Sequence, residues 1–171
     1  MIELQNLVIE PLNPTHDRTD FQCGVETLDR YLKDRAKQDI KRRISRVFVA
    51  TKSDNPKAVL GYYTLSTLSI ELNQLPEKLA RKLPKHPLPA ALVGRLAVCN
   101  AAQGQGVGKL LLADAIKRTM AVSDQIAIYA MVVDAVDAID DNAKGFYEQF
   151  GFSRLSDDSS RLFLPLISVR L

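Results

Sequence analysis

The sequence predicts a single α/β domain, and three observations lead to this fold class. Its length of 171 residues falls within the roughly 100–200 residues of one domain core. Hydrophobic residues make up 46% of the chain and charged residues 25%, a balance that excludes disordered and low-complexity proteins. Segments rich in β-branched residues alternate with segments of helical apolar periodicity. We therefore expect one core built from both strands and helices.

The N-terminal part of the chain is predicted to contain three strands and a helix. Residues 1–12 have the composition of a strand that ends in proline-rich sequence. From Val25, apolar residues recur at three- and four-residue steps, which predicts a helix with a charged opposite face. The segments Arg46–Ala50 and Ala58–Ser66 flank turn-forming residues, a pattern typical of two antiparallel strands in a hairpin.

The middle of the chain is predicted to form a loop, a strand and a second helix. Residues 75–89 carry four prolines and are expected to be mostly loop, with one helical turn. Residues 92–98 are predicted to be one strand. A glycine-rich turn follows, and an apolar stripe that includes Leu111 then predicts an amphipathic helix beginning near Val107.

The C-terminal part is predicted to contain a buried strand, a last helix and a final strand or strand pair. Residues 126–133 are apolar throughout, which is typical of a strand buried on both faces. Asp140, Asp141 and Asn142 give N-cap signals for the helix, and Gly151 is a suitable C-cap. Residues 161–169 then return to a strand-like composition.

Composition also limits localisation and chemistry. No apolar run approaches the roughly 20 residues that a membrane span requires. The N-terminus carries acidic residues where a signal peptide has basic ones. Cys23 and Cys99 make neither a disulfide framework nor a metal cluster. We therefore expect a cytoplasmic protein without a bound metal or a membrane contact.

The net charge of +3 is unevenly distributed. Residues 1–85 hold 15 Lys and Arg against 11 Asp and Glu, whereas residues 86–171 hold 8 against 9. The basic residues that could contact phosphate groups are Lys33, Lys37, Lys41, Arg42, Arg43, Arg46, Arg81, Lys82, Lys85 and Arg95. On a regular α-helix, Lys33, Lys37 and Lys41 would form one row. These residues are either a solvated surface or the docking face for an anionic acceptor.

The glycine-rich turn at residues 103–108 lies between a predicted strand and a predicted helix, an arrangement that directs backbone N–H groups at a phosphate. A P-loop is excluded because Gln103 and Leu110 stand where Gly and Ser or Thr are required. A Rossmann turn is excluded because Lys109 replaces its third glycine.

The turn and a second motif together resemble the GNAT N-acetyltransferase superfamily. Gln103-x-x-Gly106-x-Gly108 matches the Q/R-x-x-G-x-G/A turn that binds the pyrophosphate of acetyl-CoA in that family. Downstream, residues 142–152 match N-x-x-x-F-Y-x-x-x-G-F, so the resemblance covers about residues 92–152. It implies one GNAT domain over residues 1–171, with a central mixed, mostly antiparallel sheet that splays into a V and is flanked by helices.

Over nearly its full length, the chain is also similar to the TacT/AtaT-type acetyltransferase toxins of bacterial toxin–antitoxin pairs. The segments that carry this similarity include FQCG at 21–24, LDRYL at 28–32, GRLAV at 94–98 and RLFLP at 161–165. Such toxins acetylate the α-amine of aminoacyl-tRNA, which blocks translation. A ribbon-helix-helix antitoxin neutralises them, and they are often homodimers. The alternatives are a GNAT enzyme acting on a small amine or protein, and a non-catalytic module that binds acetyl-CoA or RNA.

The resemblance implies a set of residues that bind acetyl-CoA: Leu96, Ala97, Val98, Gln103, Gly104, Gln105, Gly106, Val107, Gly108, Lys109, Asn142 and Phe146. Tyr147 is the candidate general acid, because a phenol with a pKa near 10 can protonate a departing thiolate. Helical periodicity alone would instead place Tyr147 in the core, and Asn142 could be a plain N-cap. The segment 94–100 carries no Asp or Glu as a general base, which departs from some family members. Cys99 has no recognisable His partner and is expected to be inert.

Overall fold

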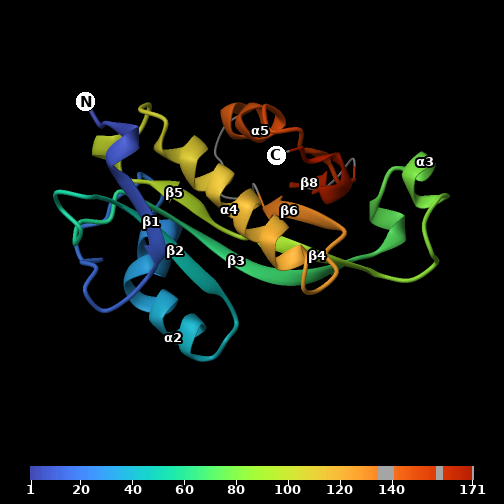
Figure 1. The fold of residues 1–171 in the computed structure, drawn as a ribbon, viewed down its shortest axis with the longest axis horizontal. Coiled ribbons are helices and arrows are strands. Elements are labelled where there is room, and N and C mark those ends of the chain that lie inside the picture. Colours follow the sequence, from blue (N-terminus) through green and yellow to red (C-terminus); the bar gives the residue numbers. More distant parts are fainter. Residues whose placement is uncertain (135–140, 157–159, 171) are drawn as a thin grey trace. The chain divides into compact units, whose positions relative to one another are not determined.

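The computed structural model describes residues 1–134, 141–156 and 160–170 (Figure 1). The strand order is β1-β2-β3-β4-β6-β8-β7, and β5 pairs with β3. Among the pairings whose register is described, only that of β4 with β6 is parallel. This confirms the mixed, mostly antiparallel sheet. The chain divides into two compact units, Met1–Ser66 with Gly94–Lys117 and Thr67–Val93 with Arg118–Leu171. The interpretation of residues 1–171 as one domain stays a prediction.

The first unit holds the N-terminal strands and the predicted hairpin. Its elements are η1 (Leu4–Asn6), β1 (Leu7–Pro11), α1 (Glu26–Arg30), η2 (Tyr31–Arg35), α2 (Ala36–Lys41), β2 (Arg46–Lys52), β3 (Gly61–Ile70, through Ser66), β5 (Leu96–Val98), η4 (Asn100–Ala102) and α4 (Val107–Ser123, through Lys117). β2 and β3 pair antiparallel, with Val49 opposite Tyr62, so the hairpin prediction is confirmed.

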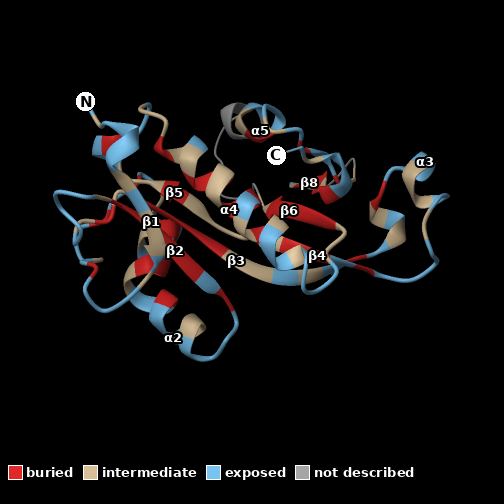
Figure 2. Cartoon of the chain, viewed as in Figure 1, coloured by how far each residue is buried: buried red, intermediate tan, exposed pale blue. Residues whose placement is uncertain are grey.

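Successive side chains along β2 and β3 point alternately to the two opposite faces of the sheet. Val47, Val49 and Tyr62 join one buried cluster with residues of α1, η2 and α2. Phe48 and Tyr63 stack on each other with ring centroids 5.1 Å apart. The Tyr63 hydroxyl donates to Asp114 of α4 at 2.7 Å, so α4 packs on this second face. Figure 2 shows the buried residues along β2 and β3 and the exposed surface of α2.

The predicted helix beginning at Val25 is present, but it is not a regular α-helix. Val25 is its N-cap, and the π-helical segment η2 lies between α1 and α2. In this segment the Ala36 N–H bonds to the Tyr31 carbonyl, five residues back. The wider turn changes the spacing of side chains, so the prediction of one row through Lys33, Lys37 and Lys41 is wrong in its geometry.

The second unit holds the remaining strands and the last helix. Its elements are the end of β3, η3 (Leu72–Gln74), α3 (Glu77–Ala80), β4 (Leu88–Val93), the end of α4, β6 (Ala130–Asp134), α5 (Asp141–Glu148), β7 (Ser153–Arg154), β8 (Arg161–Pro165) and η5 (Leu166–Ser168). Ile70, Ala130, Val132 and Phe163 lie together in its buried cluster. The φ of Gly151 is +95°, which confirms this residue as the C-cap of α5.

Several predicted boundaries are wrong. The predicted strand at residues 92–98 is two strands, because β4 pairs with β6 whereas β5 pairs with β3 after a break at residues 94–95. β4 begins at Leu88 although prolines flank that residue, so part of the predicted loop is a strand. β6 begins only at Ala130, and Ile126 is 65% exposed because the chain is still leaving α4 there. β1 is shorter than predicted, since residues 4–6 form a 3-10 turn. β3 begins at Gly61 rather than Ala58.

Within the residues described, no helix is long and apolar enough to cross a membrane.

Candidate functional site

In the first unit, β5 leads through η4 into the glycine turn and then into the 17-residue helix α4, as predicted. Gly104 and Gly106 have φ values of +75° and +89°, a conformation that strains other residues. Within the described residues, no hydrogen bond is donated by the backbone N–H groups of residues 104–109. These free donors and the positive end of α4 together suit a bound phosphate or pyrophosphate.

Two glutamine side chains stabilise this turn through hydrogen bonds to backbone groups. Gln103 Nε2 donates to the carbonyl oxygens of Cys23 at 2.8 Å and Val98 at 2.9 Å. Gln105 Nε2 donates to the Ala101 carbonyl at 3.0 Å, and Gln105 Oε1 accepts from the Ile2 N–H at 2.7 Å. Both side chains are therefore occupied in shaping the turn, and a direct contact from them to a ligand stays a prediction.

The edge of β5 that faces away from β3, here called the free edge, presents N–H groups that are unbonded within the described residues, while its Val98 carbonyl accepts from Gln103 Nε2 at 2.9 Å. The Cys99 N–H donates to the Leu60 carbonyl and the Thr64 N–H donates to the Arg95 carbonyl. Because hydrogen-bonding alternates along an antiparallel pair, the N–H groups of Leu96 and Val98 point away from β3. β5 pairs only with β3 in the part of the chain that the structure describes. An extended ligand with amide groups could therefore pair with this edge as an added strand would.

In the second unit, Tyr147 lies on α5 with only 7% of its surface exposed. Its ring packs edge-on against Phe146, at 5.1 Å between centroids, and against Phe152, at 5.8 Å. Burial raises the pKa of Tyr147 to about 12, and the negative charge of Asp134 contributes to the shift. The phenol is protonated at neutral pH with or without this shift, and the higher pKa makes it a weaker acid than a free tyrosine, so its candidacy rests on its place in the motif and not on the shift.

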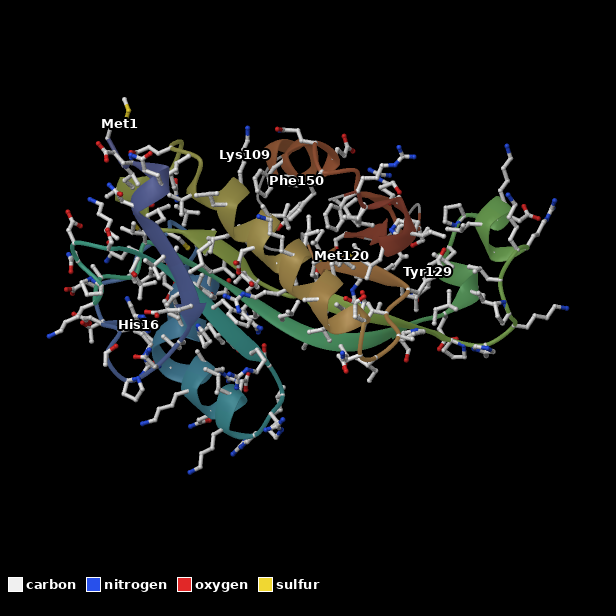
Figure 3. All side chains as sticks on the ribbon, in the orientation of Figure 1. Met1, His16, Lys109, Met120, Tyr129 and Phe150 are labelled. Atoms are coloured by element: carbon white, nitrogen blue, oxygen red, sulfur yellow. The ribbon has the colours of Figure 1, made fainter. Side chains whose placement is uncertain are left out.

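The other predicted acetyl-CoA residues are distributed over both units. Val107 is buried and Gly108 is half-buried in the first turn of α4, while the Lys109 side chain extends into solvent from the same turn (Figure 3). Phe146 is half-buried on α5. Asn142 falls in the first turn of α5, and its side chain lies outside the described residues.

The predicted phosphate-contacting residues of the first unit do not share one surface hollow. Lys33 is half-buried and lines a hollow together with Asp29 and Asn100. Lys37 and Lys41 are exposed and line a different hollow, of about 390 Å³. The other exposed basic residues of the predicted set are Arg42, Arg43 and Arg46 in this unit and Arg81, Lys82 and Lys85 in the second unit.

Cysteine and histidine chemistry has little support in the described parts of the chain. Cys23 is buried, and this burial raises its pKa to about 11, so it is a poor nucleophile. His16 is also buried and bonds to Glu10 at 2.9 Å. The described residues contain no group of His, Cys, Asp and Glu that could hold a metal ion.

Two features of this region have no clear sequence signal. A Cβ on Gly106 would lie 3.1 Å from Leu4 Cδ1, so the N-terminal turn η1 packs against the glycine turn. The Arg95 guanidinium lies over the Tyr31 ring, with Cζ 3.6 Å from its centroid. Both contacts join residues far apart in the sequence, and local periodicity carries no information about such pairs.

Comparison with known proteins identifies the family. Residues 43–154 match the model of the acetyltransferase (GNAT) domain. The chain is 33% identical over 169 residues to a probable toxin TacT of Sinorhizobium fredii, covering 95% of this chain and 93% of the relative. It is 34% identical over 159 residues to a tRNA-acetylating toxin of Mycobacterium tuberculosis, covering 93% of this chain and 92% of the relative.

Solved structures agree with the sequence comparisons. AtaT in complex with acetyl-methionyl-tRNAfMet superposes with a TM-score of 0.85 at 31% identity, covering 95% of this chain and 96% of that chain. A mutant of AtaT bound to acetyl-CoA and to the C-terminus of the antitoxin AtaR superposes with a TM-score of 0.78 at 28% identity, covering 95% of both chains. The free N–H groups of the glycine turn, the fold and these matches lead to one conclusion: the chain belongs to the GNAT acetyltransferase family.

Proposed function

We propose that this chain transfers the acetyl group of acetyl-CoA to the α-amine of an aminoacyl-tRNA and so blocks translation. The observation that carries the proposal is the strand–turn–helix of β5 and α4, with its free N–H groups at residues 104–109. The tRNA-acetylating relative and the AtaT complex with acetyl-methionyl-tRNAfMet support the choice of acceptor.

Different residues of the chain would bind acetyl-CoA, polarise the acyl carbonyl and protonate the leaving group. The N–H groups of residues 104–109 would hold the pyrophosphate of acetyl-CoA, which supplies the acetyl group. The free edge of β5 would align the pantetheine amides, and the N–H groups of Leu96 or Val98 would polarise the acyl carbonyl. As the amine nitrogen bonds to the acyl carbon and the C–S bond breaks, Tyr147 would donate its proton to the departing thiolate, and the proton released by the amine would restore the Tyr147 phenol.

The lack of an obvious general base fits this acceptor. The segment 94–100 carries no Asp or Glu. The amine of an aminoacyl ester has a lower pKa than that of lysine, so a larger fraction is neutral at physiological pH without a base. The described basic residues on both units would contact the acceptor through its phosphates.

We also propose the partners of the chain. The AtaT structure holds the C-terminus of the antitoxin AtaR, and this likeness supports a cognate antitoxin for the present chain. The resemblance further supports an antitoxin of the ribbon-helix-helix type, a homodimeric toxin, a cytoplasmic location and a single domain over residues 1–171.

A labelled transfer experiment tests the proposal. The purified chain is incubated with radiolabelled acetyl-CoA and, separately, with total aminoacyl-tRNA, deacylated tRNA, a polyamine mixture and ribosomal protein. The expected label appears on aminoacyl-tRNA alone and is released as an N-acetylamino acid when the ester is hydrolysed in mild alkali. Label on polyamines or protein in place of aminoacyl-tRNA would identify another acetyltransferase, and binding of acetyl-CoA without any transfer would identify a binding module.

A further inference from the structure

The backbone of Arg95 is fixed on both sides by one threonine. The Arg95 N–H donates to Thr64 Oγ1 at 3.0 Å, and the Arg95 carbonyl accepts from the Thr64 N–H at 3.0 Å. Thr64 is only 2% exposed. Since Arg95 immediately precedes β5, its Cα is held in place next to the free edge of that strand.

The Arg95 side chain is held over an aromatic ring. Its Cζ lies 3.6 Å from the centroid of Tyr31, which is 3% exposed. The Tyr31 hydroxyl donates to Asp39 Oδ2 at 2.9 Å, and this bond fixes the ring from its far end. Stacking uses the flat face of the guanidinium and leaves the donors in its plane available. Within the described part of the chain, no hydrogen bond or ion pair occupies these donors.

The π-helical segment places Tyr31 for this contact. Tyr31 is the first residue of η2, and its carbonyl accepts from the Ala36 N–H. Arg18 Nη1 donates to the carbonyls of Leu32 at 3.1 Å and Lys33 at 3.4 Å, which stabilises the irregular turn from outside. π-Helical turns are rare and concentrate at functional sites, because they change the direction of one side chain without ending the helix.

We propose that Tyr31 and Asp39 are positioning residues that hold the Arg95 guanidinium beside β5, where it binds the acceptor phosphodiester nearest to the reacting amine. This inference rests on the proposed function, because it assumes a nucleic-acid acceptor. A stacked guanidinium with free in-plane donors suits two phosphate oxygens at once, which a freely rotating lysine cannot match. Arg95 is thereby distinguished from the exposed lysines of α2, which contribute charge without a fixed direction.

Binding of deacylated total tRNA by the whole chain tests the proposal, measured as Kd over a range of salt concentrations. Arg95→Ala should lower the slope of log Kd against log salt by about 0.7, the value for one single-strand phosphate contact. Tyr31→Leu should raise Kd by about three- to tenfold, which corresponds to the loss of a cation–π contact. The double variant should bind no more weakly than Arg95→Ala alone, because Tyr31 acts only through Arg95.

Phe21→Leu is the matched control. Phe21 belongs to the same buried cluster and contacts Tyr62, at 5.5 Å between centroids. This variant should lose stability but keep the tRNA Kd of the parent chain. If Tyr31→Leu does not fold, Tyr31→Phe tests the same coupling, with a rise in Kd of about twofold expected from the lost tether to Asp39.

The inference would be overturned if both Tyr31 variants bound tRNA as tightly as the parent chain. It would also be overturned if the losses of tRNA affinity were fully additive in the double variant with Arg95→Ala. Its failure is separable from failure of the proposed function. A parent chain that acetylates aminoacyl-tRNA while the Tyr31 variants bind tRNA normally overturns only the inference. A parent chain that transfers no acetyl group to aminoacyl-tRNA overturns the function on which the inference rests.

Discussion

Replacement of Gly106 by alanine tests whether the geometry of the turn supports ligand binding. The φ of Gly106 is +89°, and an alanine in this region of the Ramachandran map costs about 1–2 kcal/mol. The new Cβ would also lie 3.1 Å from Leu4 Cδ1, but that atom is the end of a flexible side chain and can move. We therefore expect Gly106→Ala to lower the free energy of unfolding by about 1–2 kcal/mol.

The same substitution should weaken acetyl-CoA binding, because relaxation of the strain would redirect the N–H groups of residues 104–109. Strain that the free chain relieves by relaxing has to be restored on binding. Full relief of about 1–2 kcal/mol therefore corresponds to a rise in Kd of about 5- to 30-fold with little loss of stability, and partial relief divides the effect between the two measurements. Urea denaturation measures the first effect, and isothermal titration calorimetry with acetyl-CoA measures the second.

Three further variants separate the causes. Gly104→Ala has the φ strain, at +75°, but no atom lies within 4 Å of its Cβ. Leu4→Ala combined with Gly106→Ala removes the contact and leaves the strain. Gly145→Ala, on α5 in open space, is a control expected to keep the acetyl-CoA affinity. Parent-like acetyl-CoA affinity in Gly106→Ala, together with parent-like stability, would mean that the turn relaxes without any cost to binding, and this result would refute the assignment of the turn as the pyrophosphate site.

Three other predictions follow from individual side chains. Gln103→Ala removes the bonds to the Cys23 and Val98 carbonyls, so urea denaturation should show a loss of about 1–3 kcal/mol and calorimetry a weaker acetyl-CoA complex. The folded-state pKa of Tyr147, raised to about 12, lies above the unfolded value near 10, so this residue adds stability below about pH 10 that is lost as the pH rises towards 12. Urea titrations at about pH 9 and pH 11 should therefore show a smaller alkaline loss in Tyr147→Phe than in the parent chain. In a native thiol titration, Cys99 should react well before the buried Cys23, and equal rates would contradict the burial of Cys23.

Local features of the fold could be predicted from the sequence because their causes are local. The glycines at 104 and 106 signal positive φ, and the apolar stripe of α4 begins directly after them. The hairpin of β2 and β3 was predictable since turn residues separate two β-branched runs. Gly151 likewise marks the end of α5 by its conformational freedom.

Features that depend on tertiary contacts could not be predicted in this way. The break between β4 and β5 is a change of strand partner, and the apolar composition of residues 92–98 is the same on both sides of it. The π-helical turn at Tyr31 depends on Arg18 and on Asp39, which lie on either side of it in the chain. Gln103 matches its motif, but its bond to the Cys23 carbonyl joins residues 80 positions apart.

The role of Tyr147 in acetyl transfer is the central claim, and one kinetic measurement tests it most directly. Tyr147→Phe keeps both ring contacts, with Phe146 and Phe152, and removes only the hydroxyl. In a single turnover with saturating acetyl-CoA and aminoacyl-tRNA, the variant should transfer the acetyl group about 10²–10⁴-fold more slowly, the usual contribution of a general acid. Its acetyl-CoA Kd should equal that of the parent chain. Transfer by Tyr147→Phe at the parent rate would contradict the account and leave Tyr147 as a residue of the core.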